Sequence, residues 1–299
     1  MQSEDLKREK LLRKRKKETA KKKQKPSVYD LPMFHEMERP NKNPEKEFQL
    51  GQSQNILDQF FQKDARNMEE IRDNTVSLIV TSPPYNVDKA YGKYEDASGL
   101  KDYLGYLDAV WKECHRILRP GGRLCINIAN IGRAPYIPLE AYIAEHCIKL
   151  GFFMRGQIVW DKGASVGAST AWGSWLSPSN PTLRDVHEYI LVFSKGTNQL
   201  KKAVDSLDPD ITKDEFLKYG KSIWVMTTAN AKQVGHPAPF PLELPHRCIK
   251  LYTYPGDLVV DPFAGSGTTC LAAKETERHW IGYDVDKNWV DLAHKRLTS

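Results

Sequence analysis

The chain has 299 residues, 40% of them hydrophobic, and a formal net charge of +6. That length can bury the core of one large domain, and no apolar run approaches the roughly 20 residues that cross a bilayer. We therefore expect a soluble, cytoplasmic protein without a membrane partner. Five scattered cysteines without a CxxC pair disfavour a disulfide framework and a structural zinc, and we expect them to act as small core hydrophobes.

Positive charge is concentrated at the N-terminus. Residues 1–25 contain twelve Lys and Arg residues and four acidic ones, so this stretch carries +8 and the rest of the chain −2. Such a run can tether a protein to a polyanion without choosing a sequence, and a solubilising tail without a partner fits the charge equally well. We predict a basic tail over 1–27, disordered or helical when bound, a linker or arm over 28–50, and one domain over 51–299.

From about residue 51 onward, strand-like and helix-like patterns alternate along the chain. The expected strands are 60–64, a short apolar run ending in an acid, then 77–81, 123–129, 157–160, 189–193, 258–261 and 280–284. The expected helices cover 103–118, 139–150, 268–274 and 287–297, and Pro120-Gly121-Gly122 is expected to form a turn. This alternation predicts an α/β fold with a mostly parallel, doubly wound sheet that helices cover on both faces.

The stretch LVVDPFAGSGTTCLAAKE, residues 258–275, has the pattern of a strand, a glycine-containing turn and a helix. Gly265 and Gly267 permit a tight turn, and the start of the following helix offers free N–H groups. No Gly-Lys-Ser/Thr follows, which disfavours a P-loop, and GxGxxG is absent. Asp284 stands 23 residues after Asp261, an offset at which an acid can accept hydrogen bonds from both ribose hydroxyls of an adenosine.

The late position of this glycine loop constrains the topology. Only one further strand fits into the 38 residues after Asp261, so the other strands have to come from upstream. We therefore expect a sheet wound in circularly permuted order, with the catalytic half first and the cofactor half last. That order makes LIVTSPPYN, residues 78–86, a neighbour of the glycine loop in space.

The stretch TSPPY, residues 81–85, ends a strand at the edge of the sheet where ligands lie in open α/β folds. Pro83 and Pro84 fix φ and withhold N–H groups, so the turn is stiff and the carbonyls of Ser82 and Pro83 can point outward. Tyr85 then adds an aromatic face. A stiff wall of acceptors beside a stacking surface suits a planar heterocycle with an exocyclic NH₂ group, whereas a proline-rich turn with Tyr85 packed in the core is the alternative.

TSPPYN together with DPFAGSGTT resembles the amino-methylating DNA methyltransferases of the β group, in which the Pro-Pro-Tyr motif precedes the glycine loop. The likeness runs from about Phe60 to Leu297 and includes the LRPGG turn and HPAPFPLELPHRCI. It implies a Rossmann-like methyltransferase fold, the cofactor S-adenosyl-L-methionine, double-stranded DNA as substrate and a place in a restriction-modification system. A cognate restriction endonuclease and a homodimer stay open.

The resemblance also implies roles for individual residues. The target base would be held by Ser82, Pro83, Pro84 and Tyr85. The cofactor would be surrounded by Asp261, Phe263, Gly265, Gly267 and Thr268, with Asp284 on the ribose, Asp64 by the adenine amino group, and Pro239, Phe240, Pro241 and Leu244 closing the pocket. The family usually has Gly where Lys63 stands, and no metal is implied.

An exocyclic amine on a base is a poor nucleophile because its lone pair is delocalised into the ring. Hydrogen bonds from the NH₂ group to the Ser82 side chain and the Pro83 carbonyl would draw the nitrogen towards sp³ and free the lone pair for attack on the sulfonium methyl. The base would have to leave the duplex, and stacking on Tyr85 would offset part of that cost. No cysteine nucleophile belongs to these motifs, which disfavours methylation at cytosine C5.

Ser82 in the first position of the motif favours cytosine N4 over adenine N6, because a carboxylate is commoner there in the adenine enzymes. The expected DNA-facing loops lie near 87–99, 162–184 and 196–235, and the second, with Trp172 and Trp175, could equally be a plain surface loop. Adenine N6 methylation, methylation of RNA or a small molecule, and a non-catalytic nucleic-acid-binding module are the alternatives. The intact Ser82-Pro83-Pro84-Tyr85 turn, together with Gly265 and Gly267, disfavours the last of these.

Overall fold

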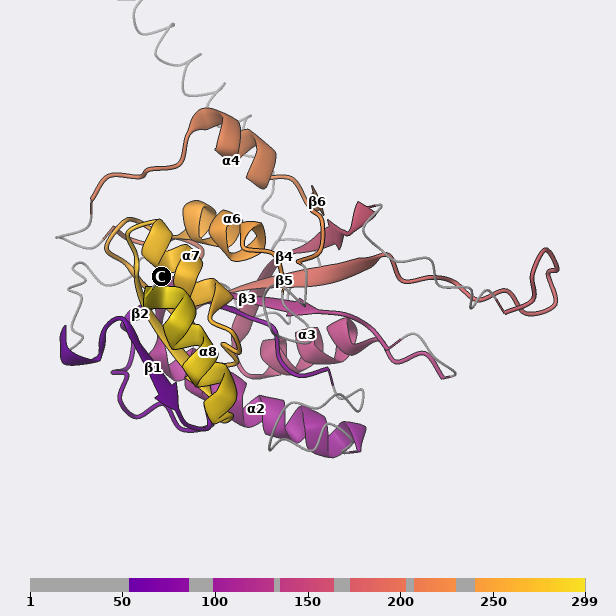
Figure 1. The fold of residues 1–299 in the computed structure, drawn as a ribbon, viewed down its shortest axis with the longest axis horizontal. Coiled ribbons are helices and arrows are strands. Elements are labelled where there is room, and N and C mark those ends of the chain that lie inside the picture. The colour runs from indigo at the N-terminus through magenta and orange to yellow at the C-terminus, as the bar shows by residue number, and fades with distance from the viewer. Residues whose placement is uncertain are drawn as a thin grey trace, which may run out of the picture. The chain divides into compact units, whose positions relative to one another are not determined.

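An eight-stranded sheet with helices on both faces makes up the domain (Figure 1). The structure, a computed structural model, describes residues 54–85, 99–131, 135–163, 173–202, 207–229 and 240–298. These residues all belong to one unit, Asn41–Ser299. The predicted tail 1–27 and arm 28–50 lie outside the described residues. So do most of the predicted loop 87–99, the part of loop 162–184 from 164 to 172, the parts of loop 196–235 from 203 to 206 and from 230 to 235, and Pro239.

The strands lie across the sheet in the order β1-β8-β7-β2-β3-β5-β4-β6. They are β1 (Gln59–Gln62), β2 (Val76–Thr81), β3 (Leu118–Ile128), β4 (Phe152–Asp161), β5 (His187–Lys195), β6 (Ile223–Val225), β7 (Leu258–Asp261) and β8 (His279–Asp284). Neighbouring strands run parallel except where β5 is involved, since β5 is antiparallel to both β3 and β4. The predicted mostly parallel α/β sheet is confirmed.

Two groups of helices cover the two faces of the sheet. Helices α2 (Leu100–Ile117) and α3 (Leu139–Lys149) share one hydrophobic cluster with the sheet. Helices α6 (Glu243–Tyr252), α7 (Thr268–Glu275) and α8 (Lys287–Thr298) share the other. A 3₁₀ turn (Gln54–Ile56) precedes β1, and the short helix α4 (Lys213–Tyr219) precedes β6. The doubly wound arrangement expected from the alternating pattern is therefore present.

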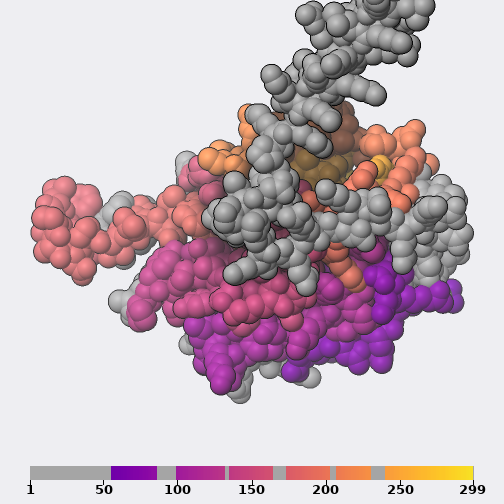
Figure 2. Space-filling view, turned by 180° about the vertical axis from the view of Figure 1, so that it is seen from behind, coloured from indigo at the N-terminus to yellow at the C-terminus, as the bar shows by residue number. Residues whose placement is uncertain are grey.

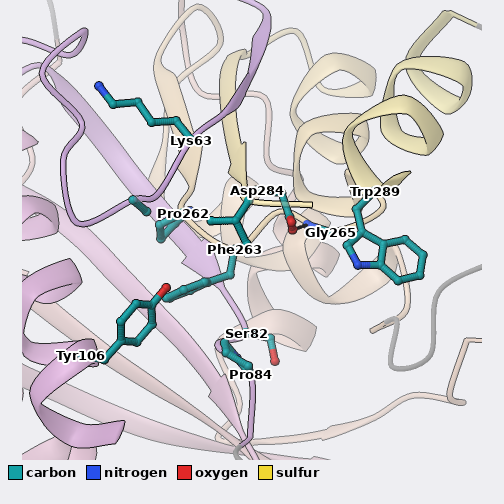
Figure 3. Close-up of a pocket in the computed structure, with 11 residues that line it drawn as sticks. Lys63, Ser82, Pro84, Tyr106, Pro262, Phe263, Gly265, Asp284 and Trp289 are labelled. Atoms are coloured by element: carbon teal, nitrogen blue, oxygen red, sulfur yellow. Dashed lines mark hydrogen bonds between the residues drawn. The ribbon is translucent and has the colours of Figure 1, made fainter. Parts of the chain in front are cut away.

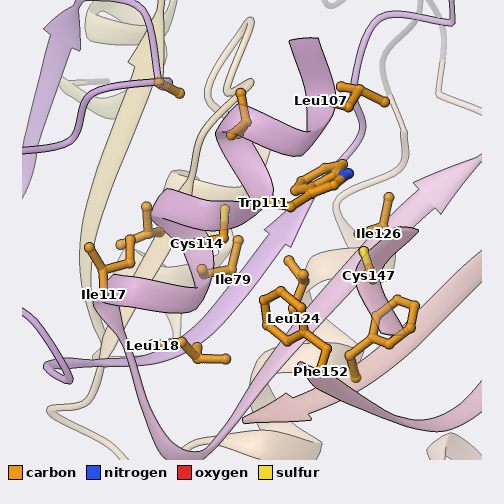
Figure 4. Packing of buried hydrophobic residues seen from close by; sticks show 14 of the residues in the cluster. Ile79, Leu107, Trp111, Cys114, Ile117, Leu118, Leu124, Ile126, Cys147 and Phe152 are labelled. Carbon is orange, nitrogen blue, oxygen red and sulfur yellow. The ribbon is translucent and has the colours of Figure 1, made fainter. Parts of the chain in front are cut away.

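Strand β2 is the centre of both clusters. All six of its residues are buried, which explains why it reads as a continuous apolar run rather than an alternating one. Ile79 packs with Trp111 and Leu124 on the α2 side (Figure 4). Leu78 and Val80 belong to the cluster on the other face. A strand held on both faces gives the turn that follows it a fixed base.

The permuted order places the two motifs on adjacent strands. Strand β2 pairs in parallel with β7, so that Leu78 lies opposite Val259 and Ile79 opposite Val260. At the carboxyl ends of these strands, Thr81 Oγ1 donates a hydrogen bond to Asp261 Oδ1 over 2.7 Å. The first strand in the chain, β1, pairs with the last one, β8. The topology argued from segment lengths is thus the topology of the sheet.

The predicted turn at Pro120-Gly121-Gly122 is instead part of β3. Its residues form an irregularity in the strand, because Val76 lies opposite Leu118 whereas Leu78 lies opposite Arg123. Gly121 has φ of +81°, and a Cβ atom there would lie 2.1 Å from the carbonyl oxygen of Gln199. The glycine signal was therefore real, but it marks a bulge and a close backbone contact rather than the start of a strand.

The sequence pattern also missed α4, β6 and α6. Helix α6 carries Pro245 in its first turn, a position that needs no hydrogen-bond donor, so a proline-rich stretch became helical. Strand β6 has only three residues, too few for a periodic pattern. Among the described helices, none is long and apolar enough to span a membrane. All five cysteines are free and buried, as expected for core hydrophobes.

Candidate active site

A pocket lies at the carboxyl edge of the sheet, between the ends of β1, β2, β7 and β8 (Figure 3). Its empty volume is about 580 Å³, part of it open to solvent. The lining residues are Lys63, Ala65, Ser82, Pro84, Tyr106, Pro262, Phe263, Gly265, Asp284, Val285 and Trp289. Residues of the Pro-Pro-Tyr turn and of the glycine loop therefore face the same space.

The Pro-Pro-Tyr turn contributes Ser82 and Pro84 to this lining, whereas Pro83 is buried. The carbonyl of Pro84 accepts a hydrogen bond of 2.8 Å from the Tyr103 hydroxyl on α2, which ties the turn to the helix. The Tyr85 ring is half-buried and packs against the core, and its hydroxyl lies 2.9 Å from Ser82 Oγ. Tyr85 itself is not among the residues that line the pocket in the described part of the chain.

The glycine loop is held by hydrogen bonds to acidic side chains at the ends of two strands. Phe263 N donates to Asp261 Oδ1 over 3.0 Å, and Gly265 N donates to Asp284 Oδ2 over 3.0 Å. Gly267 precedes α7 with φ of +77°, a left-handed conformation that glycine adopts without steric cost. The loop conformation thus depends mainly on backbone groups, and Phe263 and Gly265 are left facing the pocket.

Two buried carboxyl groups stand at the base of this loop. Burial raises the pKa of Asp261 to about 6, although hydrogen bonds from Thr81, Thr269 and the Phe263 backbone oppose the shift. Burial likewise raises the pKa of Asp284 to about 6, against hydrogen bonds from backbone N–H groups. Only Asp284 lines the pocket, so it is the acid that can accept hydrogen bonds from a bound hydroxyl there.

Asp64 does not line the pocket, although its neighbours Lys63 and Ala65 do. Its carboxylate accepts hydrogen bonds from the Arg66 backbone over 2.9 Å and from the Arg66 guanidinium over 2.7 Å. The guanidinium also lies over the Tyr106 ring, 5.1 Å from its centroid. The segment after β1 therefore reaches the pocket. The predicted acid in it, Asp64, is hydrogen-bonded to the Arg66 side chain.

The remaining predicted cofactor residues do not line the pocket in the described part of the chain. Leu244 is fully buried in the core, and Phe240 packs against the same cluster. Pro241 accepts a backbone hydrogen bond from Leu244 N at the start of α6. Thr268 is buried, and its hydroxyl accepts a 3.2 Å hydrogen bond from Arg296. None of these, nor Gly267, is among the described lining residues, so any effect on a ligand passes through packing.

Sequence reasoning missed several residues of the site. Tyr106 and Trp289 line the pocket, and Figure 3 shows them on opposite sides of Phe263. Trp289 follows Asp284 at the start of α8. An aromatic residue so close to the predicted ribose-binding acid was a signal that the sequence offered. Asn127 interrupts the apolar strand β3 and was a readable signal, since a polar residue in a buried strand needs partners. No local sequence pattern indicated that Glu188 belongs to the site.

The segment 173–186 projects away from the sheet (Figures 1 and 2). Ser174 N donates to the carbonyl of Asn180 over 2.9 Å, which closes the tip of this segment. The tip exposes Trp175 by 66% and Leu176 by 88%. The described part of the predicted loop 162–184 is therefore an exposed apolar projection.

The fit of the pocket to an adenosyl compound can be judged from its own residues. Aromatic rings of Phe263, Tyr106 and Trp289 offer apolar surface for a planar base and a sugar. Asp284 is the acidic acceptor that ribose hydroxyls require. Lys63, the cationic side chain among the described lining residues, is paired with Glu69 and Glu70 over 2.7 and 2.8 Å. The lining fits S-adenosylmethionine better than a diphosphate.

Comparison with known proteins defines the class. The family model described as DNA methylase, covering the N6 and N4 enzymes, matches residues 76–295. The chain is 33% identical over 270 residues to the type II methyltransferase M.MjaI of Methanocaldococcus jannaschii, covering 78% of this chain and 89% of the relative. It is 29% identical to the DNA adenine methyltransferase YhdJ of Escherichia coli, with 77% and 79% of the two chains covered.

Solved structures agree with this class. The Thermus thermophilus protein TTHA0409, solved in complex with S-adenosyl-L-methionine, is 32% identical, with 79% of this chain and 90% of that chain covered and a TM-score of 0.64. The PvuII cytosine-N4-specific DNA methyltransferase shares the fold with a TM-score of 0.62 at 23% identity, over 79% and 85% of the two chains. The chain belongs to the DNA methylase family of β-group amino-methyltransferases, whose cofactor is S-adenosyl-L-methionine.

Proposed function

We propose that this DNA methyltransferase modifies the exocyclic N4 amine of cytosine in double-stranded DNA, at a specific site, by direct attack on the methyl group. The observation that carries the proposal is that Ser82 and Pro84 line the same pocket as Phe263, Gly265 and Asp284. Methyl transfer requires the acceptor amine and the donor to meet without an intervening wall. The permuted topology supplies that arrangement.

Residues of the glycine loop and of the segment after β8 would hold the cofactor. Phe263, Gly265 and Asp284 would surround it, with Asp284 accepting from the ribose hydroxyls, and the Tyr106 and Trp289 rings would add apolar surface. When bound, S-adenosylmethionine supplies a methyl group activated by a sulfonium centre. Asp261, Gly267, Thr268, Phe240, Pro241 and Leu244 would act by supporting the loop and the pocket wall, and Asp64 by fixing the segment after β1.

Residues of the Pro-Pro-Tyr turn would prepare the amine. The Ser82 hydroxyl and the Pro83 carbonyl would accept hydrogen bonds from the NH₂ group, which frees the nitrogen lone pair and stabilises the charge that develops on nitrogen. Pro83 and Pro84 keep the turn stiff, and the Tyr103 hydrogen bond to Pro84 adds to that stiffness. The target base would enter by flipping out of the duplex, and the Tyr85 ring would lie against it.

Serine at the first position of the motif supports cytosine N4 as the target. Adenine N6 is the second candidate, favoured by the 29% identity to an adenine methyltransferase. Both bases present an NH₂ group beside a ring nitrogen, so the same acceptors serve either. The choice between cytosine and adenine would therefore depend on contacts between the protein and the edge of the base ring.

Binding of the duplex would involve the basic residues 1–27, the projection 173–186 and the segments near 87–99 and 196–235. The +8 charge of the first 25 residues supports an electrostatic contribution that weakens with salt. The exposed side chains of Trp175 and Leu176 support a groove contact by the projection. A cognate endonuclease is suggested by the type II names of relatives such as M.MjaI.

The test is incubation of the purified protein with labelled S-adenosylmethionine and genomic DNA, followed by nucleoside digestion and mass analysis. The expected product is 4-methylcytosine, and sequencing of the methylated DNA then gives the recognised site. 6-Methyladenine would replace the leading proposal by the second candidate. Label in RNA or a small molecule, or no product at all, would contradict both and favour a different substrate or a non-catalytic role.

A further inference from the structure

A buried hydrogen-bond network connects the Pro-Pro-Tyr turn to the strands beside it. The Tyr85 hydroxyl lies 2.9 Å from Ser82 Oγ and 3.0 Å from Glu188 Oε2. Asn127 Nδ2 lies 2.6 Å from the same Glu188 oxygen and 3.0 Å from the Tyr85 hydroxyl. Lys162 Nζ lies 2.6 Å from Glu188 Oε1. Asn127 is 2% exposed and Glu188 is 9% exposed, so bulk water has little access to the inner end of the network.

The direction of every hydrogen bond in this network follows from Glu188. A carboxylate paired with a lysine ammonium can only accept, so the Tyr85 hydroxyl donates its single proton to Glu188. With that proton committed, Tyr85 can only accept from Ser82. The Ser82 hydroxyl therefore points its proton at Tyr85, and its lone pairs are left for another donor.

Asn127 enforces the same direction. Its amide Nδ2 donates to Glu188 Oε2 over 2.6 Å and lies 3.0 Å from the Tyr85 hydroxyl. The reversed amide would place a carbonyl oxygen 2.6 Å from a carboxylate oxygen, which is repulsive. Its 3.4 Å approach to Ser82 Oγ is long and leaves the serine lone pairs largely free. The polarity of the chain from Ser82 through Tyr85 to Glu188 is thus fixed by two neighbouring strands.

We propose that Glu188 is a positioning residue for methyl transfer: by accepting the Tyr85 proton, it holds the Ser82 hydroxyl as an acceptor for the target amine. This proposal rests on the proposed function, because it concerns the group that receives the N–H of the base. Glu188 is absent from the described pocket lining, so it acts through Tyr85. Lys162 forms an ion pair with the other carboxylate oxygen of Glu188, and Asn127 keeps the carboxylate oriented.

Glu188→Gln is the decisive change, since glutamine has the same shape and adds a donor. Tyr85 can then accept from the amide and donate to Ser82, which occupies the lone pair that the substrate needs. We expect kcat to fall about 10- to 100-fold, with KM for DNA and for S-adenosylmethionine unchanged within about twofold. Fluorescence of a duplex with 2-aminopurine at the target position should rise on binding as in wild type, because base entry precedes the defect. Glu145→Gln, which removes an exposed carboxylate on α3, is the matched control.

A double-mutant cycle separates positioning from a structural role. Tyr85→Phe removes the hydroxyl through which Glu188 acts, so Glu188→Gln in that background should lower kcat by less than about twofold. A further loss of about 10-fold in the Tyr85→Phe background would overturn the proposal. If Glu188→Gln alone folds poorly, the double variant Lys162→Met with Glu188→Gln removes both charges of the ion pair. For this double variant we expect the same changes in kcat and KM as for Glu188→Gln.

The outcomes also separate this proposal from the function on which it rests. A wild-type protein that leaves no methylated base, or a Ser82→Ala variant with full turnover, would refute the proposed function itself. If the wild-type protein methylates DNA and Ser82→Ala loses turnover, a Glu188→Gln variant with the kcat of wild type refutes only the positioning role. A rise in KM without a change in kcat would equally refute it, since that result would place Glu188 in binding.

Discussion

The two halves of the pocket are built in different ways. The glycine-loop half comes from one continuous stretch, in which Gly265 N bonds to Asp284 only 19 positions further along the chain. The proline-turn half combines side chains of the turn after β2 with side chains of β3 and β5, and its Tyr85–Glu188 bond joins residues 103 positions apart. One half depends on backbone groups and two acids, whereas the other depends on a network of side chains with a required direction.

This difference predicts that the two halves fail separately. Substitutions in the glycine-loop half should change the affinity for the cofactor and leave the chemical step intact. Substitutions in the proline-turn half should lower turnover and leave cofactor binding intact. Variants in each half of the pocket therefore test whether cofactor binding and turnover are separable.

The largest effect is expected for Ser82→Ala. Loss of the acceptor for the NH₂ group should lower kcat by about 10²–10³-fold, the usual cost of removing one preorganised partner of a developing charge. The dissociation constant of S-adenosylmethionine, measured by calorimetry, should change by less than about twofold. A large loss of cofactor affinity would contradict the separation of the two halves.

Asp284→Asn should have the opposite pattern. The amide replaces one of the two acceptor oxygens by an NH₂ donor and carries no charge, so the dissociation constant should rise about 10- to 100-fold. At saturating cofactor, kcat should stay within a few-fold of wild type. Asp291→Asn on α8 removes an exposed carboxylate and is the control, with both constants unchanged.

Cofactor affinity should also depend on pH. Since burial raises the pKa of Asp284 to about 6, this group is an ionised acceptor above that pH and a neutral acid below it. Affinity should therefore be constant near pH 7–8 and fall by up to about tenfold per unit below about pH 6. Asp284→Asn should remove the dependence. If the dependence persists, it belongs to Asp261, whose pKa is raised to about 6 by the same burial.

The smallest effect on turnover is expected at Gly282, behind the pocket. A Cβ atom there would lie 2.8 Å from Phe60, so Gly282→Ala should lower the free energy of unfolding by about 1–3 kcal/mol. Urea titration would measure this, and Phe60→Leu in the same chain should recover part of the loss. Gly156→Ala, which meets no atom within 4 Å, is the control. Equal losses in both variants would refute close packing between β1 and β8.

Most of the fold could be predicted because its strands are continuous apolar runs and its helices have clear periodicity. The bulge at Gly121 was mistaken for a turn, since a glycine pair signals a special backbone conformation without showing what approaches it. Helix α6 was missed because a proline in the first turn looks like a helix breaker. Nothing in the sequence indicated that Arg66 would engage the carboxylate of Asp64.

The amino-acid sequence by itself determined the class of fold, the permuted order of the strands and the two motifs at the edge of the sheet. These follow from local periodicity, from segment lengths and from residues that restrict the backbone. The tertiary structure alone decided that Asn127 and Glu188 stand behind the Ser-Pro-Pro-Tyr turn and that Tyr106 and Trp289 enter the pocket. The physical reason is that a hydrogen bond between distant strands depends on register and side-chain direction, and neither leaves a pattern in the sequence.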